Sequence, residues 1–157
     1  MEDEIKLLLV DLLGRMNIAV ESIETVPSYL PTHITFLVKS SDSRLLIGTK
    51  GETLNALTYL VRKILAKKIG HEDVKIIIDV NNYQEKNIKS LKDKAMILGE
   101  RVKSYGISVE MEPMSPYERM IIHSVFENNP HVKTESHGEG VNRRVVLKFV
   151  ETGETFF

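Results

Sequence analysis

Two glycines enclose a threonine and a lysine at Gly48, Thr49, Lys50 and Gly51, between two apolar runs with helical spacing. A glycine inside a helix costs up to about 1 kcal/mol relative to alanine, so this placement needs another reason. Gly48 can end one helix, and Gly51 can turn the chain into the next. Because both lack a Cβ atom, a phosphate-bearing chain could approach the backbone, where helix amides and Lys50 would hold an anion. The alternative is an ordinary tight turn with a solvated lysine, and these four residues alone favour it.

Arg119 and His123 stand four residues apart, so on a helix they lie on one face. A guanidinium and an imidazole on one face suit a phosphate, because one is a permanent forked donor and the other a second donor. We expect both to be solvent-accessible and close to Arg143 or Arg144, and we expect protonation of His123 to strengthen the site below about pH 6.5. The alternative is a solvated polar stripe in which Arg119 pairs with a glutamate of its own helix, such as Glu127.

Three histidines, at 123, 131 and 137, lie near glutamates in the sequence and raise the question of a metal or an acid–base catalyst. The sequence has no HExxH pattern, no compact zinc-ligand spacing and no cysteine. No serine, threonine or lysine stands in a recognised nucleophile motif. The sequence therefore predicts a protein that is not an enzyme and needs no metal or other cofactor.

The composition is that of a globular chain with a local rather than a global charge imbalance. The 157 residues suffice for one medium or two small domains, and 42% of them are hydrophobic. The start is acidic, unlike a secretory signal, and no apolar run approaches the ~20 residues of a membrane span, so we expect a cytoplasmic protein without membrane insertion. Residues 80–107 hold 6 Lys and Arg against 3 Asp and Glu, whereas residues 108–157 hold 5 against 8. Any nucleic-acid site must therefore be local.

Hydrophobic periodicity predicts an α+β fold in the first half, with a three-stranded sheet covered by helices on one face. The expected elements are a helix over 2–16, strands over 18–26 and 32–39, a short helix before Gly48, a longer helix ending near Gly70, and a strand over 73–80.

The second half begins with a basic amphipathic helix over 82–105 that Gly106 should end. A small α/β unit should follow, with a strand over 107–112, a helix over 115–128, a strand over 131–136, a glycine loop and a strand over 143–150. On that second helix, Tyr117, Met120, Ile121 and Val125 should face the core. We expect domains over 1–80 and 107–157, connected by residues 81–106.

In this order of elements, the motif IGTKGETL resembles the type II KH domain, whose GxxG loop clamps about four nucleotides of a single strand. The Arg-x-x-x-His pattern of Arg119 and His123 resembles the R-three-H domain, which binds single-stranded nucleic acid. The stretches DVNNYQEKNIKSL and MEPMSPYERMIIH look like the Jag (KhpB) family of bacterial proteins, in which KH and R-three-H domains stand in tandem. Members of that family usually have arginines where Gln84 and Asn87 stand here.

The resemblance implies a KH domain over 1–80 followed by an R-three-H domain over 107–157, without the separate N-terminal Jag domain or as a fragment of a longer protein. It implies a partner that is single-stranded RNA, or single-stranded DNA, and a post-transcriptional regulator linked to cell envelope growth, division and cell shape, sometimes to sporulation. The residues implied to hold phosphates are Gly48, Thr49, Lys50, Gly51, Arg119, His123, Arg143 and Arg144.

Base contacts beside the GxxG loop could come from Leu45, Ile47 and Leu54, although we expect at least two of these to be buried in the core. Phe36 and Tyr59 could stack on bases or equally belong to the core.

A second hypothesis is a protein-interaction scaffold, a KH-mediated homodimer or a heterodimer with another small KH protein, in which RNA contacts are secondary. The acidic C-terminal part favours the scaffold, and Lys50 in an intact GTKG loop favours RNA binding.

Overall fold

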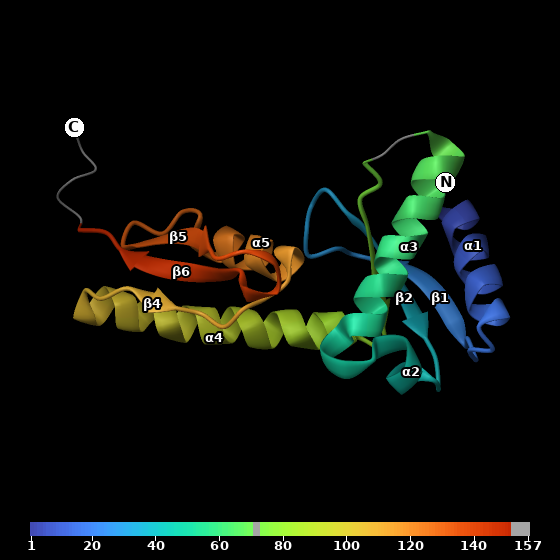
Figure 1. Cartoon of the computed structure of the whole chain (residues 1–157), viewed down its shortest axis with the longest axis horizontal. Helices are drawn as coiled ribbons and strands as arrows, with labels where there is room; N and C mark the ends of the chain where they lie inside the picture. Colours follow the sequence, from blue (N-terminus) through green and yellow to red (C-terminus); the bar gives the residue numbers. More distant parts are fainter. Residues whose placement is uncertain (71–72, 152–157) are drawn as a thin grey trace. The chain divides into compact units, whose positions relative to one another are not determined.

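The computed structural model describes residues 1–70 and 73–151, and the chain divides into two compact units (Figure 1). Unit 1 is Met1–Glu85 and unit 2 is Lys86–Phe157. Both units mix helices with a three-stranded sheet, so the predicted α+β class is confirmed. None of the described helices is long and apolar enough to cross a membrane.

Unit 1 follows the predicted order of helix, strand, strand, two helices and strand. Its elements are α1 (Glu2–Arg15), β1 (Ser22–Val26), β2 (Ile34–Lys39), α2 (Ser43–Ile47), the 3-10 turn η1 (Thr49–Gly51), α3 (Glu52–Ile69) and β3 (Ile76–Val80). In the sheet, β2 lies in the middle, antiparallel to β1 and parallel to β3. The parallel pair needs a long crossover, which α2 and α3 provide.

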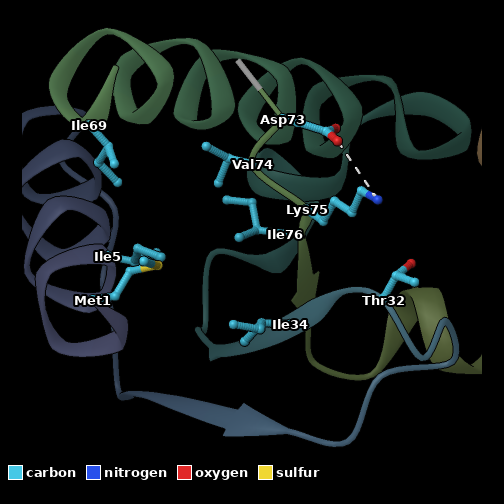
Figure 2. Close-up of a pocket in the computed structure, with 9 residues that line it drawn as sticks. All are labelled: Met1, Ile5, Thr32, Ile34, Ile69, Asp73, Val74, Lys75 and Ile76. Carbon is cyan, nitrogen blue, oxygen red and sulfur yellow. Dashed lines mark ion pairs between the residues drawn. The ribbon is translucent and has the colours of Figure 1, made fainter. Parts of the chain in front are cut away.

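One end of this layered arrangement has a hollow of about 340 Å³ where the start of α1 meets β2 and the approach to β3 (Figure 2). Its lining is mostly apolar, with Ile5, Ile34 and Ile76 pointing into it. Lys75 forms an ion pair with Asp73 at 3.7 Å, and both side chains are well exposed.

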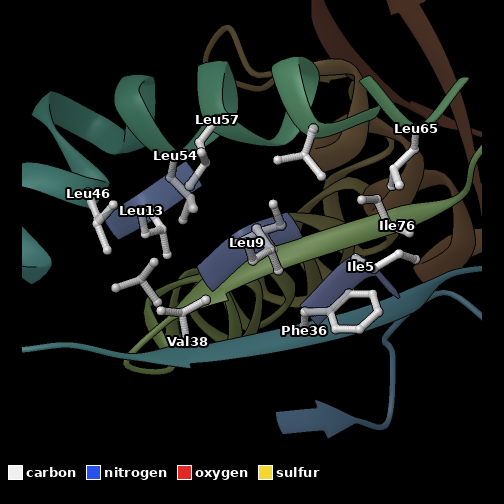
Figure 3. Packing of buried hydrophobic residues seen from close by; sticks show 13 residues of the cluster. Ile5, Leu9, Leu13, Phe36, Val38, Leu46, Leu54, Leu57, Leu65 and Ile76 are labelled. Atoms are coloured by element: carbon white, nitrogen blue, oxygen red, sulfur yellow. The ribbon is translucent and has the colours of Figure 1, made fainter. Parts of the chain in front are cut away.

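Next to this hollow, buried side chains of the helices pack against those of the sheet and form the core of unit 1 (Figure 3). Alternate residues of β2 and β3 face the helices, with Phe36 and Ile78 in register and both fully buried. Leu9 of α1 and Leu54 of α3 meet them and are fully buried as well. Since a fully buried side chain of this size contributes about 1.5–3 kcal/mol, this layer holds α1 and α3 against the sheet.

The opposite face of the sheet is buried too, which the prediction of helices on one face did not anticipate. Thr35, Leu37, Ile77 and Asp79 alternate with the core residues and so point to this second face. All four are buried, and none is more than 6% exposed. Two of the four carry polar groups, and such groups need partners when they leave water.

Asp79 finds its partners at the start of α4 (Tyr83–Tyr105). Its carboxylate accepts hydrogen bonds from the backbone amides of Gln84, at 2.8 Å, and Glu85, at 3.2 Å. These are amides that the first turn of a helix leaves without intrahelical acceptors, so Asp79 caps α4 from the strand before it. Burial raises the pKa of this carboxyl, and the amide hydrogen bonds oppose the rise.

The chain turns from β3 into α4 through two asparagines with left-handed backbones, Asn81 (φ 49°) and Asn82 (φ 61°). Asparagine tolerates this conformation better than most residues. The Asn81 amide group also donates to the carbonyl of Ser40 at 2.8 Å and accepts from its amide at 3.0 Å. The turn is therefore tied to the end of β2.

Unit 2 contains most of α4, then β4 (Val109–Glu110), α5 (Pro116–Phe126), β5 (Val132–His137), the 3-10 turn η2 (Gly140–Asn142) and β6 (Arg144–Phe149). The sheet order is β4-β6-β5, and both pairs are antiparallel. A capping box of Ser115 and Glu118, with Pro116 in the first turn, begins α5.

The helix over 82–105 is part of the core of unit 2 and not only a connection. Ala95 and Val102 of α4 are fully buried against Ile122 and Phe126 of α5 and strand β6. Gly99 approaches Phe126 so closely that a Cβ atom at position 99 would lie 2.6 Å from Cε1 of the ring. A larger residue at this position would push the two helices apart.

Several expected boundaries and faces were wrong. The first strand begins at Ser22 because residues before it are held by side chains: the Asp42 carboxylate accepts from the Ala19 amide, and the Ser40 hydroxyl donates to the Ala19 carbonyl. The strand expected over 107–112 is only two residues long. On α5, Met120 is exposed, and Ile122 and Phe126 take the core positions with Ile121.

The two helical glycines of α1 and α4 make a matched stability test. We expect Gly99→Ala to destabilise the chain by about 1–3 kcal/mol, because the new methyl group overlaps Phe126. Gly14→Ala should stabilise it by about 0.5–1 kcal/mol, because nothing lies within 4 Å of a Cβ atom there and alanine is the better helix former. Urea denaturation followed by circular dichroism measures both. A stabilising Gly99→Ala would contradict the packing described for α4.

Candidate nucleic-acid interface

The loop at residues 48–51 lies between α2 and α3, as expected, and three of its four residues have positive φ angles. Gly48 has φ 71°, Lys50 φ 52° and Gly51 φ 80°. The Gly48 amide donates to the Arg44 carbonyl at 3.0 Å and ends α2. The side chains of Thr49 and Lys50 are exposed, so the loop presents a hydroxyl and a cation to solvent.

The glycines are required by the loop's own packing. A Cβ atom on Gly48 would lie 2.2 Å from the hydroxyl oxygen of Thr53, and one on Gly51 would lie 3.1 Å from Cε1 of Tyr83. Both positions also have a φ that favours glycine. The missing Cβ atoms thus make room for Thr53 and Tyr83 of the same chain, and the loop offers Thr49 and Lys50 to a ligand.

Lys50 occupies a conformation in which glycine or asparagine would be relaxed. A left-handed backbone costs a residue with a Cβ atom about 1 kcal/mol. The fold therefore keeps a lysine at the tip of the loop at the expense of stability, and such strain is characteristic of functional positions.

The side chains considered for base contacts differ in exposure. Leu45 is 67% exposed, Ile47 is half-buried and Leu54 is fully buried in the core. Phe36 is also fully buried, whereas Tyr59 on α3 is 64% exposed. The ammonium of Lys63 lies 5.5 Å from the centre of the Tyr59 ring, within range of a cation–π interaction. Leu45 and Tyr59 are therefore accessible to a ligand.

In unit 2, Arg119 and His123 lie on one face of α5 and are half-buried rather than fully exposed. Nδ1 of His123 lies 2.6 Å from the hydroxyl of Thr134, and Nε2 lies 2.9 Å from the hydroxyl of Ser136. Both ring nitrogens are therefore bound to β5. Nη1 of Arg119 donates to the carbonyl of Met114 at 2.8 Å, which leaves its other donors for a ligand.

Of the two arginines expected near His123, the charge of Arg143 and not that of Arg144 acts on the imidazole. Burial, then the charges of Arg119 and Arg143, lower the pKa of His123, which places these three side chains in one electrostatic environment. Arg143 donates to the carbonyl of Gly138 at 2.8 Å. Arg144 instead forms an ion pair with Glu110 of β4 at 3.4 Å.

The structure shows no ion pair between Arg119 and Glu127 within residues 73–151. The lowered pKa of His123 also moves its protonation to a lower pH than the sequence predicted. Near neutral pH the cluster is thus two guanidinium groups beside a neutral imidazole.

Thr134 and Ser136 were missed by the sequence analysis. They stand two residues apart on β5, and this spacing puts their side chains on one face of the strand. Thr134 and Ser136 reach His123 because α5 packs against the sheet, and the order of residues alone does not reveal this packing.

The third histidine considered for catalysis has a simpler role. His137 and Lys148 both bind the carboxylate of Glu135, at 3.0 and 2.7 Å. The hydrogen bond from Lys148, then that from His137, lowers the pKa of Glu135 to about 2. No group of three His, Asp or Glu that could hold a metal occurs in the described part of the chain.

Comparison with known proteins finds one domain model that matches unit 2 and several relatives with the same name. The R-three-H domain model matches residues 89–149. RNA-binding protein KhpB of Clostridium symbiosum is 37% identical over 110 residues, which are 70% of this chain and 49% of that protein. RNA-binding protein KhpB of Bacillus subtilis is 34% identical over 136 residues, 85% of this chain and 62% of that protein. The chain thus spans about half to three fifths of the length of these relatives.

The matched residues and the fold of unit 2 define an R-three-H domain built from the second half of the chain, including most of α4. The resemblance to the Jag/KhpB family found in the sequence is confirmed, since these matches cover 70% and 85% of the chain. The chain belongs to the Jag/KhpB family.

The strained backbone at Lys50 gives a first test of the loop. Lys50→Gly should stabilise the chain by up to about 0.5 kcal/mol, because the relief of about 1 kcal/mol of backbone strain is partly offset by the entropy that glycine adds to the unfolded chain. Thr49→Gly is the control: its φ is not left-handed, so it should destabilise by about 0.5–1 kcal/mol through the entropy of the unfolded chain. Thermal unfolding measures both. Equal effects of the two changes would mean that Lys50 is not strained.

The environment of His123 predicts a pH dependence of stability. Since the folded pKa lies below the unfolded value of about 6.5, the unfolded chain takes up the proton first as pH falls. The stability contributed by neutral His123 is full above about pH 6.5 and is lost as pH falls through that value toward the folded pKa. His123→Gln removes this titration while other histidines, such as His33, titrate in both proteins. The parent should therefore lose more unfolding free energy than the variant between about pH 7.5 and about pH 5.5, and an identical loss would contradict the prediction.

Proposed function

We propose that this protein binds single-stranded RNA and has no enzymatic activity. Unit 1 would act as a type II KH domain, and its loop at residues 48–51 would hold the sugar-phosphate backbone. The observation that carries the proposal is the exposed, left-handed Lys50 between two glycines, where a cation is kept at the tip of the loop against the backbone preference. Relatives named RNA-binding protein KhpB support it.

Unit 2 would add a second phosphate contact through Arg119 and Arg143. The guanidinium of Arg119 keeps donors free beyond its bond to Met114, and Arg143 is its cationic neighbour around His123. His123 would position this surface by tying α5 to Thr134 and Ser136. Arg144 contributes less to this surface, because Glu110 already pairs with it.

An RNA strand that contacts both units would bind more tightly than one that contacts a single unit, because its second contact becomes intramolecular. Single-stranded DNA would meet the same phosphate contacts. For the cellular role we propose a cytoplasmic post-transcriptional regulator connected with cell envelope growth, division and shape, and in spore formers with sporulation.

A second candidate function is an interaction scaffold, as a homodimer or as a heterodimer with another small KH protein. It is favoured by apolar side chains exposed on unit 1: Leu7 and Val10 on α1 are 69% and 52% exposed, and Leu60 on α3 is 45% exposed. Light scattering of the purified chain separates a stable homodimer from a monomer.

The decisive test changes Thr49 and Lys50 to Asp together. The two carboxylates should repel phosphate, so affinity for a mixed pool of short single-stranded RNAs should fall at least several-fold. The logarithmic salt dependence should flatten by roughly 0.7 for each phosphate that the variant no longer neutralises. Because both side chains are exposed, the unfolding free energy should change by no more than about 0.5 kcal/mol.

Lys103→Asp with Ser104→Asp is the matched control, since it makes the same change in charge at an exposed pair near the end of α4. Filter binding measures affinity, and circular dichroism verifies the fold of both variants. Unchanged affinity of the folded Thr49 and Lys50 variant would reject RNA binding by the loop and leave the scaffold as the leading function.

A further inference from the structure

A pocket of about 400 Å³ lies on the face of the unit 1 sheet that the core helices do not cover. Leu37 and Asp79, which point to this face, line it together with the segment that follows β1. Val26, Pro27 and Leu37 give it apolar walls. Its volume is in the range of small-molecule sites.

Thr35 places an unpartnered hydroxyl group in this pocket. Its chain neighbours Ile34 and Phe36 point toward the core helices, so the Thr35 side chain points to the pocket face. Thr35 is 0% exposed, and its Oγ1 atom has no hydrogen-bond partner among the described residues. A buried hydroxyl left in this state is unfavourable, whereas valine has the same shape without the polar group. Folding alone therefore does not account for threonine at this position.

The other polar groups of the pocket make it a site for a positive charge. Asp79, 2% exposed, uses its carboxylate to accept the amides of Gln84 and Glu85, and carboxylate oxygens can accept further hydrogen bonds. Glu85 is exposed and contributes a second carboxylate, whose Oε2 accepts from Nδ2 of Asn82 and whose Oε1 can accept from a ligand. Burial, then the charges of Glu85 and Asp79, raise the pKa of Tyr29 to about 12, which places both carboxylates near this hydroxyl. The described lining includes no lysine, arginine or histidine to balance them.

We propose that this pocket binds a small organic cation of the linear polyamine class. A primary ammonium group would donate to Thr35 Oγ1 and to the carboxylates of Asp79 and Glu85, which matches its three donors to the available acceptors. The methylene chain would lie against Val26, Pro27 and Leu37. A metal ion suits the site less well, because two carboxylates alone are a poor ligand set when one accepts from backbone amides and the other from Asn82.

The test titrates the full chain with putrescine and with spermidine at low ionic strength, and follows heat of binding and Tm. We expect saturable binding and a Tm that rises with polyamine concentration. Thr35→Val should reduce this rise through a several-fold loss of affinity, while leaving the free protein at least as stable as the parent, because the unpartnered hydroxyl is gone. Glu85→Gln should weaken binding about tenfold, the effect of losing a charge-assisted hydrogen bond.

Glu21→Gln is the matched control: it removes one exposed carboxylate of unit 1 that does not line the pocket, and should leave binding unchanged. Agmatine, magnesium chloride and sodium chloride are the comparison ligands. The proposal is overturned by the absence of saturable polyamine binding, by binding that survives both Thr35→Val and Glu85→Gln, or by binding of agmatine or magnesium in preference to the polyamines. RNA affinity of Thr35→Val should equal that of the parent, so this result and the RNA-binding result are independent.

Discussion

The carboxylate of Asp79 accepts the first free amides of α4, and the positions of several other parts follow from this interaction. It sets where α4 starts relative to β3 and so brings Tyr83, the first residue of the helix, against Gly51. The ring of Tyr83 then supports the loop that presents Lys50. The same helix supplies Ala95, Gly99 and Val102 to the core of unit 2. One buried acid thus fixes the start of α4 at the end of β3 and, through Tyr83, supports the loop at residues 48–51.

Left-handed backbone occurs at residues with side chains in two functionally distinct turns of unit 1, the turn before α4 and the loop at residues 48–51. Asn81 and Asn82 carry it between β3 and α4, where asparagine lowers its cost and the Asn81 side chain binds Ser40. Lys50 carries it in the loop, where its own side chain does not lower that cost. Hydrogen bonding therefore accounts for the asparagines at the first turn, whereas the strained lysine at the second is an observation that supports the proposed RNA contact.

Periodicity and glycine placement predicted the order of elements in unit 1 and the position of the 48–51 loop, because these depend on residues close in sequence. What could not be predicted depends on tertiary packing. Thr53 and Tyr83 as the neighbours of the loop glycines, and Thr134 and Ser136 as the partners of His123, are brought there by other elements. The core-facing side of α5 was predicted wrongly at Met120, because α5 has apolar residues on several sides. Only its packing against α4 and the sheet determines that Ile122 and Phe126 are buried.

The closeness of Gly99 and Phe126 has a consequence for how this domain can evolve. The space that a side chain at position 99 would need is already filled by the ring of residue 126, so neither position is free to change by itself. A larger residue at 99 becomes acceptable only after 126 has become smaller, and a smaller residue at 126 leaves a void until 99 has grown. Substitutions at the two sites should therefore appear together along lineages, as compensating pairs whose order is constrained.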